Sequence, residues 1–364
     1  EYPAYNRRYE ANGKSFYVYT DEFPVTLKLY NVNGSYVTRT VNSYGQYIID
    51  VQRDGLWDQW FGHMLNGYAK VEVKSAEKKR QEDKAKAEAA AKKKAVEDRN
   101  AKFKQALENA GIQAESLELI IVSTTSPTQM IPCNACLVQK ELGAVKAACF
   151  DLNAACSGFI TAYQTACAYI ESGFYQKILV IGSEALSCIT DWTDRSTCIL
   201  FGDGAGAVVL TAEAGEKQVS VCGADGRMGD ALTLYSGYSS NPFGTQEPMQ
   251  RAAADDNGKN ACVRMDGQAI FRFAVRKVPQ LIEELLQKNS LQKEDIKYYI
   301  LHQANSRIIQ SVAKRLKEPE EKFPMNLSLY GNTSAASIPI LLDEMNRNGM
   351  LNRGDKLVLS GFGA

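Results

Sequence analysis

Two stretches of this sequence, 179 positions apart, carry the same order of apolar segments. Residues 118–123 correspond to 297–302, and residues 177–182 correspond to 356–361, since 297 − 118 and 356 − 177 both equal 179. Each run is short and rich in aliphatic residues, and a helix-like stretch separates the two runs of each half. This pattern is typical of buried parallel strands joined by crossover helices. The sequence therefore predicts an α/β fold built from a duplicated strand, helix, strand unit.

The first 74 residues have a different character. Short runs of alternating apolar and polar residues, such as 16–19 and 47–51, are separated by Asn-Gly and Asp-Gly pairs, which favour tight hairpin turns. We therefore predict a small antiparallel β unit over residues 1–74. Its many tyrosines, with Trp57 and Trp60, either fill a small β core or form a carbohydrate- or protein-binding surface, and the first interpretation is favoured.

Residues 75–105 consist mainly of alanine, lysine and glutamate. These residues form helices readily, but Val96 and Phe103 are the only sizeable apolar side chains among them, so we predict a connecting helix that faces solvent. A basic arm for nucleic acid or membrane is an alternative. Interspersed acidic residues dilute its charge, and it has no apolar face for insertion.

Composition argues against several functional classes. Lys and Arg number 42, as do Asp and Glu, so no overall charge favours nucleic acid, and we expect no nucleic-acid partner. No run approaches the roughly 20 apolar residues that span a bilayer, and residues 1–10 lack a signal-peptide core, so we expect a cytoplasmic protein without a membrane partner. The nine cysteines all lie between Cys133 and Cys262. An odd, clustered set is not typical of a disulfide framework, and the lone C-x-x-C has no further ligands nearby, so no metal site is predicted.

Three residues at the ends of predicted strands are candidates for chemistry. Cys156 lies in a turn of small residues where a helix begins, and a helix N-terminus favours a thiolate over a thiol. His302, one of only two histidines, ends an apolar strand. Asn332 occupies the turn of the second half that corresponds to the turn before Cys156. Each of the three could instead be structural: a buried small residue, a hydrogen-bonded histidine or a helix cap.

Together these residues and their surroundings resemble β-ketoacyl-[acyl carrier protein] synthase III. The resemblance covers about residues 106–364, in two repeat halves, 106–215 and 290–364, with a CoA-channel segment between them. It implies the thiolase-like fold, a homodimer and the first condensation of fatty acid synthesis. The matching segments are Asn-Ala-Ala-Cys-Ser-Gly-Phe at 153–159, Asp-Trp-Thr-Asp-Arg-Ser-Thr at 191–197, Phe-Gly-Asp-Gly-Ala-Gly-Ala at 201–207, Leu-His-Gln-Ala-Asn at 301–305 and Gly-Asn-Thr-Ser-Ala-Ala-Ser-Ile-Pro at 331–339.

The resemblance also implies a reaction. Cys156 would take the acyl group of an acyl-CoA, with acetyl-CoA expected, and malonyl-[acyl carrier protein] would lose CO2 to give an enolate that attacks this thioester. His302 and Asn332 would donate hydrogen bonds to the thioester oxygen as negative charge develops. Backbone N–H groups of Cys156, Gly363 and Ala364 would hold the oxyanion on the cysteine side. CoA is a substrate here, and no metal or other cofactor is expected.

Further residues are assigned by the same resemblance. Asn332 favours the CoA-primed type, because elongating synthases and thiolases carry a second histidine at this position; plant-type polyketide synthases share the Cys, His, Asn set but lack the His-Gln-Ala-Asn context. Ile131 falls where the family places a partner-supplied residue that limits acyl length. The CoA channel would be lined by Arg195, Gly267, Phe271, Ala304 and Asn305, and Arg307 and Lys314 would face the acyl carrier protein.

The sequence departs from the family pattern at both ends. The initial strand and the Trp and Arg that clamp the CoA adenine are not found, and the sequence ends at Ala364, ahead of the usual final core strand. These differences predict a chimera, a gene fusion or an incomplete gene product. Two alternatives to the synthase therefore stay open: a catalytically silent scaffold derived from a synthase, and an acyltransferase that loads Cys156 without forming a carbon–carbon bond.

Overall fold

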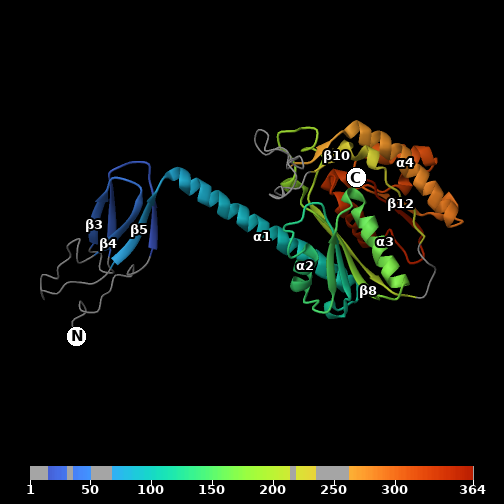
Figure 1. Ribbon diagram of the computed structural model, residues 1–364, viewed down its shortest axis with the longest axis horizontal. Coiled ribbons are helices and arrows are strands. Elements are labelled where there is room, and N and C mark those ends of the chain that lie inside the picture. The colour runs from blue at the N-terminus through green and yellow to red at the C-terminus, as the bar shows by residue number, and fades with distance from the viewer. Residues whose placement is uncertain (1–14, 31–35, 51–67, 214–218, 235–261, 364) are drawn as a thin grey trace, which may run out of the picture. The chain divides into compact units, whose positions relative to one another are not determined.

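The computed structural model describes residues 15–30, 36–50, 68–213, 219–234 and 262–363. The chain divides into two compact units, Glu1–Val96 and Glu97–Ala364 (Figure 1). The boundary falls inside helix α1 (Ala76–Ala110), which contains most of the predicted connecting helix. Its last turns do not face solvent on all sides, because Phe103 and Leu107 are buried in the core of the second unit.

The described residues of the first unit form five strands. Strand β2 (Val25–Tyr30) pairs with β3 (Tyr36–Val41), and β5 (Tyr68–Lys74) pairs with β4 (Gly45–Asp50), both antiparallel as expected. The expectation is wrong for β1 (Ser15–Tyr19), which pairs with β5 in parallel. A parallel pair needs a long connection, and here the intervening strands provide it. Trp57, Trp60 and His63 lie outside the described residues.

The second unit is layered around two sheets. The larger has the order β7-β6-β8-β9, in which β6 (Leu119–Ser123) is parallel to β7 (Ala148–Leu152) and β8 (Lys177–Glu184). Strand β9 (Gly204–Thr211) is antiparallel to β8 and forms an edge of this sheet. The smaller sheet pairs β12 (Tyr298–Leu301) with β13 (Leu357–Ser360) in parallel. These strands confirm the predicted α/β fold.

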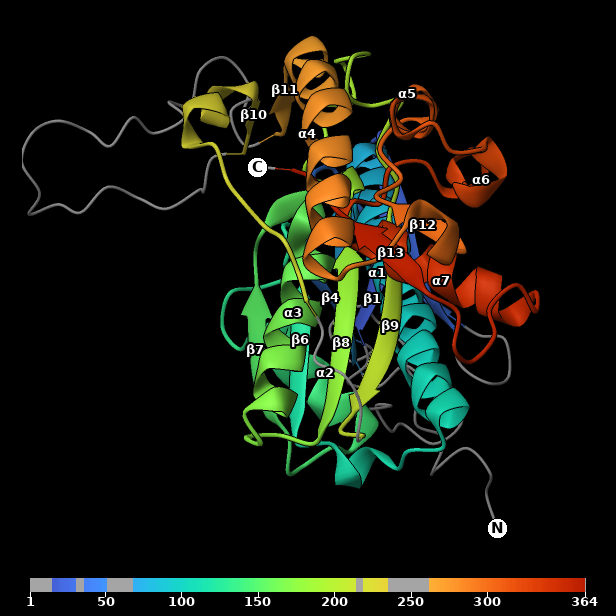
Figure 2. The ribbon, with the colours of Figure 1, turned by 90° about the vertical axis from the view of Figure 1, so that its right-hand side faces the viewer.

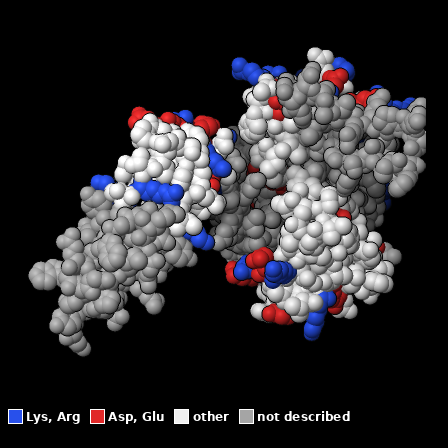
Figure 3. All heavy atoms as spheres, turned by 60° about the vertical axis from the view of Figure 1, so that its left-hand side comes forward, with Lys and Arg blue, Asp and Glu red and all other residues white. Residues whose placement is uncertain are grey.

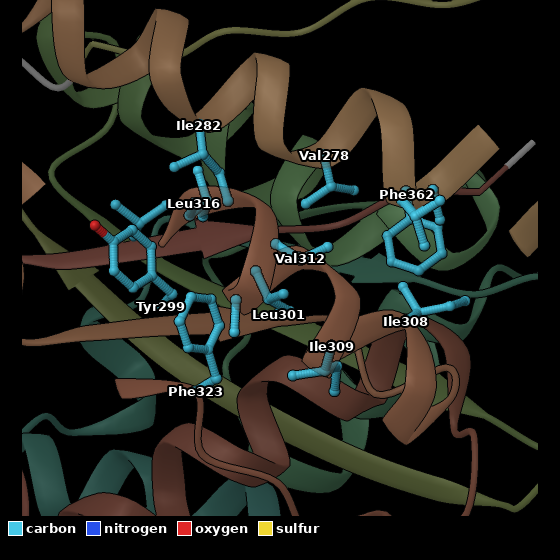
Figure 4. Packing of buried hydrophobic residues seen from close by; sticks show 14 of the residues in the cluster. Val278, Ile282, Tyr299, Leu301, Ile308, Ile309, Val312, Leu316, Phe323 and Phe362 are labelled. Atoms are coloured by element: carbon cyan, nitrogen blue, oxygen red, sulfur yellow. The ribbon is translucent and has the colours of Figure 1, made fainter. Parts of the chain in front are cut away.

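Helices cover both sheets and fill the space between them (Figure 2). The end of α1 and helix α2 (Asn134–Leu142) pack on one face of the larger sheet. Helices α3 (Gly158–Glu171) and α7 (Ser337–Arg347) share one apolar cluster with β6, β8 and β12 and thus lie between the sheets. Helices α4 (Gly267–Lys288) and α5 (Ser306–Leu316) cover the outer face of the smaller sheet, with Tyr299 and Phe323 stacked at 4.9 Å among their side chains (Figure 4). Two short strands, β10 (Leu232–Thr233) and β11 (Arg264–Met265), and the short helix α6 (Leu327–Tyr330) complete the described elements.

The duplication predicted from spacing reappears in the strand register. Leu119 of β6 pairs with Ile178 of β8, and Tyr298 of β12 pairs with Leu357 of β13. Both partners in the second pair stand 179 positions after those in the first. The turns that precede α3 and α7 are also 179 positions apart. Each contains one non-glycine residue with a positive φ, Ala155 at 44° and Ser334 at 49°. Helices α3 and α7 begin 179 positions apart.

Figure 3 shows charged side chains of both signs on one face of the molecule. On the face shown in Figure 3, Lys and Arg alternate with Asp and Glu, and wide uncharged areas lie between them. Within the described ranges, no helix is long and apolar enough to cross a bilayer.

Candidate active site

Cys156 lies in a short 3₁₀ turn, Ala155–Ser157, between β7 and α3. The sequence forms this turn because small residues accept the left-handed backbone of Ala155 and the close approach of the chain's last segment. A Cβ atom on Gly363 would lie only 2.9 Å from both Cβ and N of Cys156. Gly363 thus lies directly against Cys156, whereas Ala364 lies outside the described residues.

The thiol of Cys156 does not behave as its place at a helix N-terminus predicts. Burial raises the pKa of Cys156 to about 11, and the nearby Glu184 carboxylate adds to this by opposing a second negative charge. A hydrogen bond with the Ser334 side chain acts in the opposite sense and is outweighed. This direction is opposite to the effect predicted for a cysteine at a helix N-terminus, because removal from water disfavours the anion.

His302 follows directly after β12 and is almost fully buried, at 1% exposure. Its Nδ1 lies 2.7 Å from Oγ of Ser337, and its ring meets the edge of Phe362 at 5.3 Å between centroids. Burial lowers the pKa of His302 to about 3, so the imidazole is neutral at physiological pH. Nε2 is buried and has no hydrogen-bond partner among the described residues.

Asn332 is held rigidly by the backbone around it. Its N–H donates to the carbonyl of Leu200 and its carbonyl accepts from the N–H of Gly202, both at 2.9 Å, so that residues 200–202 and this turn are joined. Its side-chain Oδ1 accepts from the N–H of Ser334, also at 2.9 Å. The oxygen is therefore engaged, and the amide NH₂ is the polar end left for a ligand.

The three candidate residues line one cavity of about 480 Å³. Most of its wall is apolar, so it suits a thioester chain with a few polar groups at one end. Of the residues predicted for the CoA channel, Arg195 is exposed and does not line this cavity. Arg307 and Lys314, which were predicted to face the carrier protein, are exposed on α5. The remaining predicted residues that do line the cavity are Gly267, Phe271, Ala304, Asn305 and Gly363.

Sequence reasoning missed two polar groups behind this wall. Glu184 is 5% exposed and accepts hydrogen bonds from the Thr125 N–H and hydroxyl and from the Ser126 hydroxyl. Burial raises its pKa, and these bonds oppose that shift. Ser337 contacts His302 as described above. The offset of 179 could have drawn attention to Ser337, because it occupies the position of Gly158 in the first half.

A second hollow, of about 540 Å³, lies between α4 and α5 and was also missed. Three exposed arginines, Arg272, Arg276 and Arg315, contribute to it beside Met228 and Phe273. The described part of the chain contains no group of three or more His, Cys, Asp or Glu residues arranged to hold a metal ion.

Comparisons with known proteins agree with this geometry. Residues 150–226 match the family model "3-Oxoacyl-[acyl-carrier-protein (ACP)] synthase III", and residues 286–364 match the model of its C-terminal part. Cys156 falls in the first range, and His302 and Asn332 fall in the second.

Among curated proteins, the chain is similar to β-ketoacyl-[acyl-carrier-protein] synthase III of Clostridium beijerinckii, with 48% identity over 261 residues, 71% of this chain and 78% of the relative. The enzyme of the same name from Clostridium botulinum is 47% identical over 262 residues, with the same shares of both chains.

Solved structures give the same result. The crystal structure of 3-oxoacyl-[acyl-carrier-protein] synthase III from Aquifex aeolicus matches with a TM-score of 0.61 and 41% identity, over 71% of this chain and 77% of that one. The Thermus thermophilus synthase III matches with a TM-score of 0.62 and 40% identity over the same shares. With relatives this similar over more than two thirds of their length, the chain belongs to the β-ketoacyl-[acyl-carrier-protein] synthase III family.

Proposed function

We propose that the chain catalyses the condensation that starts fatty acid synthesis, from acyl-CoA and malonyl-[acyl carrier protein] to β-ketoacyl-[acyl carrier protein], CoA and CO2. The single observation that carries this proposal is the shared cavity. It joins a cysteine on the first turn of the duplicated fold to a neutral imidazole and a carboxamide on the second half. Those groups suit a reaction that needs one nucleophile and two uncharged donors.

In the first half-reaction, Cys156 is acylated. Its sulfur attacks the thioester carbonyl of acyl-CoA, the bond from carbonyl carbon to CoA sulfur breaks, and the CoA thiolate takes up the proton that the Cys156 thiol releases. The tetrahedral oxyanion would be held by the N–H groups of Cys156 and of the turn that contains Gly363. The close contact of Gly363 with Cys156 supports this assignment.

In the second half-reaction, the malonyl thioester loses CO2. The electrons of the broken carbon–carboxylate bond form an enolate, whose oxygen would accept hydrogen bonds from His302 Nε2 and the Asn332 amide. The enolate carbon then attacks the acyl carbonyl on Cys156, a carbon–carbon bond forms, and the bond from the acyl carbon to the Cys156 sulfur breaks. The Cys156 thiolate that leaves takes up one proton from water. The buried, neutral state of His302 supports its role as a donor that carries no charge. These steps use only side chains, backbone N–H groups and the thioester substrates.

The CoA thioester would enter along α4 and the start of α5. Gly267, Phe271, Ala304 and Asn305 line the cavity on that side, and its apolar wall suits the pantetheine arm. Acetyl-CoA is our proposed starter. The role of Arg195 at the nucleotide end stays a prediction.

The carrier protein would dock on the exposed side of α4 and α5. Arg307 and Lys314 are exposed on α5, and the hollow that Arg272, Arg276 and Arg315 share extends this positive surface. An acidic partner gains orientation and association rate from such a cluster. Reversing the charge at Lys314 and Arg315 should raise KM for malonyl carrier protein while KM for acetyl-CoA stays unchanged.

We also propose a homodimer. Ile131 is 90% exposed and its neighbour Met130 is 61% exposed, and adjacent apolar side chains left in solvent are typical of an interface. A monomer measured by light scattering at micromolar concentration would refute this assembly.

The test of the main proposal is acylation. Incubation with acetyl-CoA should add one acetyl group on Cys156, mapped by peptide sequencing, and Cys156→Ser should abolish thioester formation. Malonyl carrier protein should then discharge the acetyl group with release of CO2. Transfer of the acetyl group without CO2 would favour an acyltransferase. Absence of acylation in a protein shown to be folded would favour a silent scaffold.

A further inference from the structure

The hydroxyl group of Ser337 occupies an unusual position beside His302. Its Oγ lies 2.7 Å from Nδ1 of His302, and both residues are at least 98% buried. The other ring nitrogen, Nε2, is the one without a partner among the described residues. In a neutral imidazole only one nitrogen carries hydrogen. The direction of the Ser337 hydrogen bond therefore decides what Nε2 presents to a substrate.

Ser337 has one hydrogen and two possible acceptors for it. Besides Nδ1, the carbonyl oxygen of Ser334 lies 2.9 Å from Oγ, and the N–H of Gln303 approaches Oγ at 3.3 Å as a donor. The Ser334 carbonyl also accepts the backbone N–H of Ser337. It therefore keeps a partner when the hydroxyl turns to Nδ1. In that arrangement Nδ1 is an acceptor; in the opposite one Nδ1–H donates to Oγ and the hydroxyl donates to the Ser334 carbonyl. Both arrangements satisfy the polar atoms around Ser337, so the role of Nε2 as a donor selects the first.

The first half of the fold provides an internal comparison. At the offset of 179, Ser123 corresponds to His302 and Gly158 corresponds to Ser337. A Cβ on Gly158 would lie 2.0 Å from Oγ of Ser123, so this site has no room for a side chain, and Ser123 Oγ has no described partner. Of these two equivalent positions, only the one in the second half has a side-chain hydroxyl, that of Ser337, and this hydroxyl lies beside a ring nitrogen of His302.

We propose that Ser337 is a positioning residue that donates its hydroxyl hydrogen to Nδ1 of His302 and thereby keeps the imidazole in the Nε2–H tautomer. This inference rests on the proposed function, because the enolate oxygen needs a donor at Nε2. The opposite tautomer would turn a lone pair toward that oxygen. Ser337 itself does not touch the substrate; it acts through His302 alone.

The direct test is nitrogen NMR of protein labelled with ¹⁵N-histidine. The chain has two histidines, so the variant His63→Gln assigns the signals without a full backbone assignment. In the unmodified protein we expect the two ¹⁵N chemical shifts of the His302 ring to be those of a neutral imidazole with its hydrogen on Nε2. In Ser337→Ala the two shifts should move toward the other tautomer or an average of both, and Ser337→Thr, which keeps the hydroxyl, should restore the original pair.

Kinetics of the separate half-reactions provide the second readout. Ser337→Ala should slow malonyl decarboxylation about 100-fold, the cost of losing one oxyanion donor, and should affect acetyl transfer to Cys156 far less. Ser172→Ala is the matched control, because the Ser172 hydroxyl at the end of α3 also donates to a backbone carbonyl, that of Tyr169, but Ser172 lines neither hollow; it should leave both half-reactions unchanged.

Two NMR results would overturn the proposal: an Nδ1–H tautomer in the unmodified protein, or ¹⁵N shifts that do not change in Ser337→Ala. Equal loss of both half-reactions in Ser337→Ala would also overturn it, because that outcome indicates a general structural role. Failure of the unmodified protein to acylate Cys156 would instead refute the proposed function, while the tautomer would still be read from the NMR spectrum.

Discussion

The protonation of Cys156 can be tested by alkylation at different pH values. With a pKa of about 11, the thiolate fraction is about 10⁻⁴ at pH 7, about 10⁻² at pH 9 and about 10⁻¹ at pH 10. Iodoacetamide reacts with the thiolate. The rate at Cys156 should therefore rise about 100-fold from pH 7 to 9 and close to tenfold again from pH 9 to 10.

Free cysteine, with a pKa of about 8.5, sets the comparison, because its rate gains less than twofold above pH 9. Peptide mapping by mass spectrometry is needed, since eight other cysteines are present. Alkylation of the exposed Cys188 and Cys222, measured in the same digest, shows that the iodoacetamide is active. A rate at Cys156 that levels off near pH 7 would refute the reasoning, and would mean that the helix N-terminus and the Ser334 hydrogen bond outweigh burial.

Three further predictions follow from the site. Asn332→Ala should lower the rate of malonyl decarboxylation by about 10²–10³ while Cys156 still acylates, because one oxyanion donor is lost; a change below threefold in half-reaction assays would contradict the assignment. Gly363→Ala should slow acylation, since its Cβ would lie 2.9 Å from Cys156, and intact-mass time courses measure this; an unchanged rate would exclude close packing there. The pKa of His302 is about 3 in the folded state against about 6.5 when unfolded, so unfolding is increasingly favoured as pH falls below 6.5, by roughly 3 kcal/mol at pH 4. Urea titrations should show that His302→Gln loses less stability between pH 7 and 4 than the unmodified protein, and parallel losses would contradict this.

Much of the fold of the second unit could be predicted, because the spacing of apolar segments in the sequence reveals the duplication. The register of β6 with β8 and of β12 with β13 repeats at the offset read from the sequence. The parallel pairing of β1 with β5 could not be read in this way. Strand direction in the first unit depends on which segments meet across a connection of nearly 50 residues, and alternation of apolar residues carries no such information.

The site could be predicted in part for a similar reason. Cys156, His302 and Asn332 end strands or begin turns, so the topology brings them to one cavity. The high pKa of Cys156 could not be predicted, because it depends on Glu184 and on burial, and both come from tertiary packing. Ser337 was missed because a serine at a helix start is normally a cap, and only the folded chain places it at 2.7 Å from His302.

The two halves also indicate how one scaffold holds two different chemical groups. Each 3₁₀ turn begins with a residue of left-handed backbone, Ala155 in the first half and Ser334 in the second. The next residue is Cys156 in the first turn and Ala335 in the second. The nucleophile therefore belongs to the first half, while the strand end of the second half carries His302. The two halves pack closely at this point, since a Cβ on Gly182 would lie 2.3 Å from the carbonyl oxygen of Ala335. The cavity at their junction therefore combines the nucleophile of one half with the donors of the other.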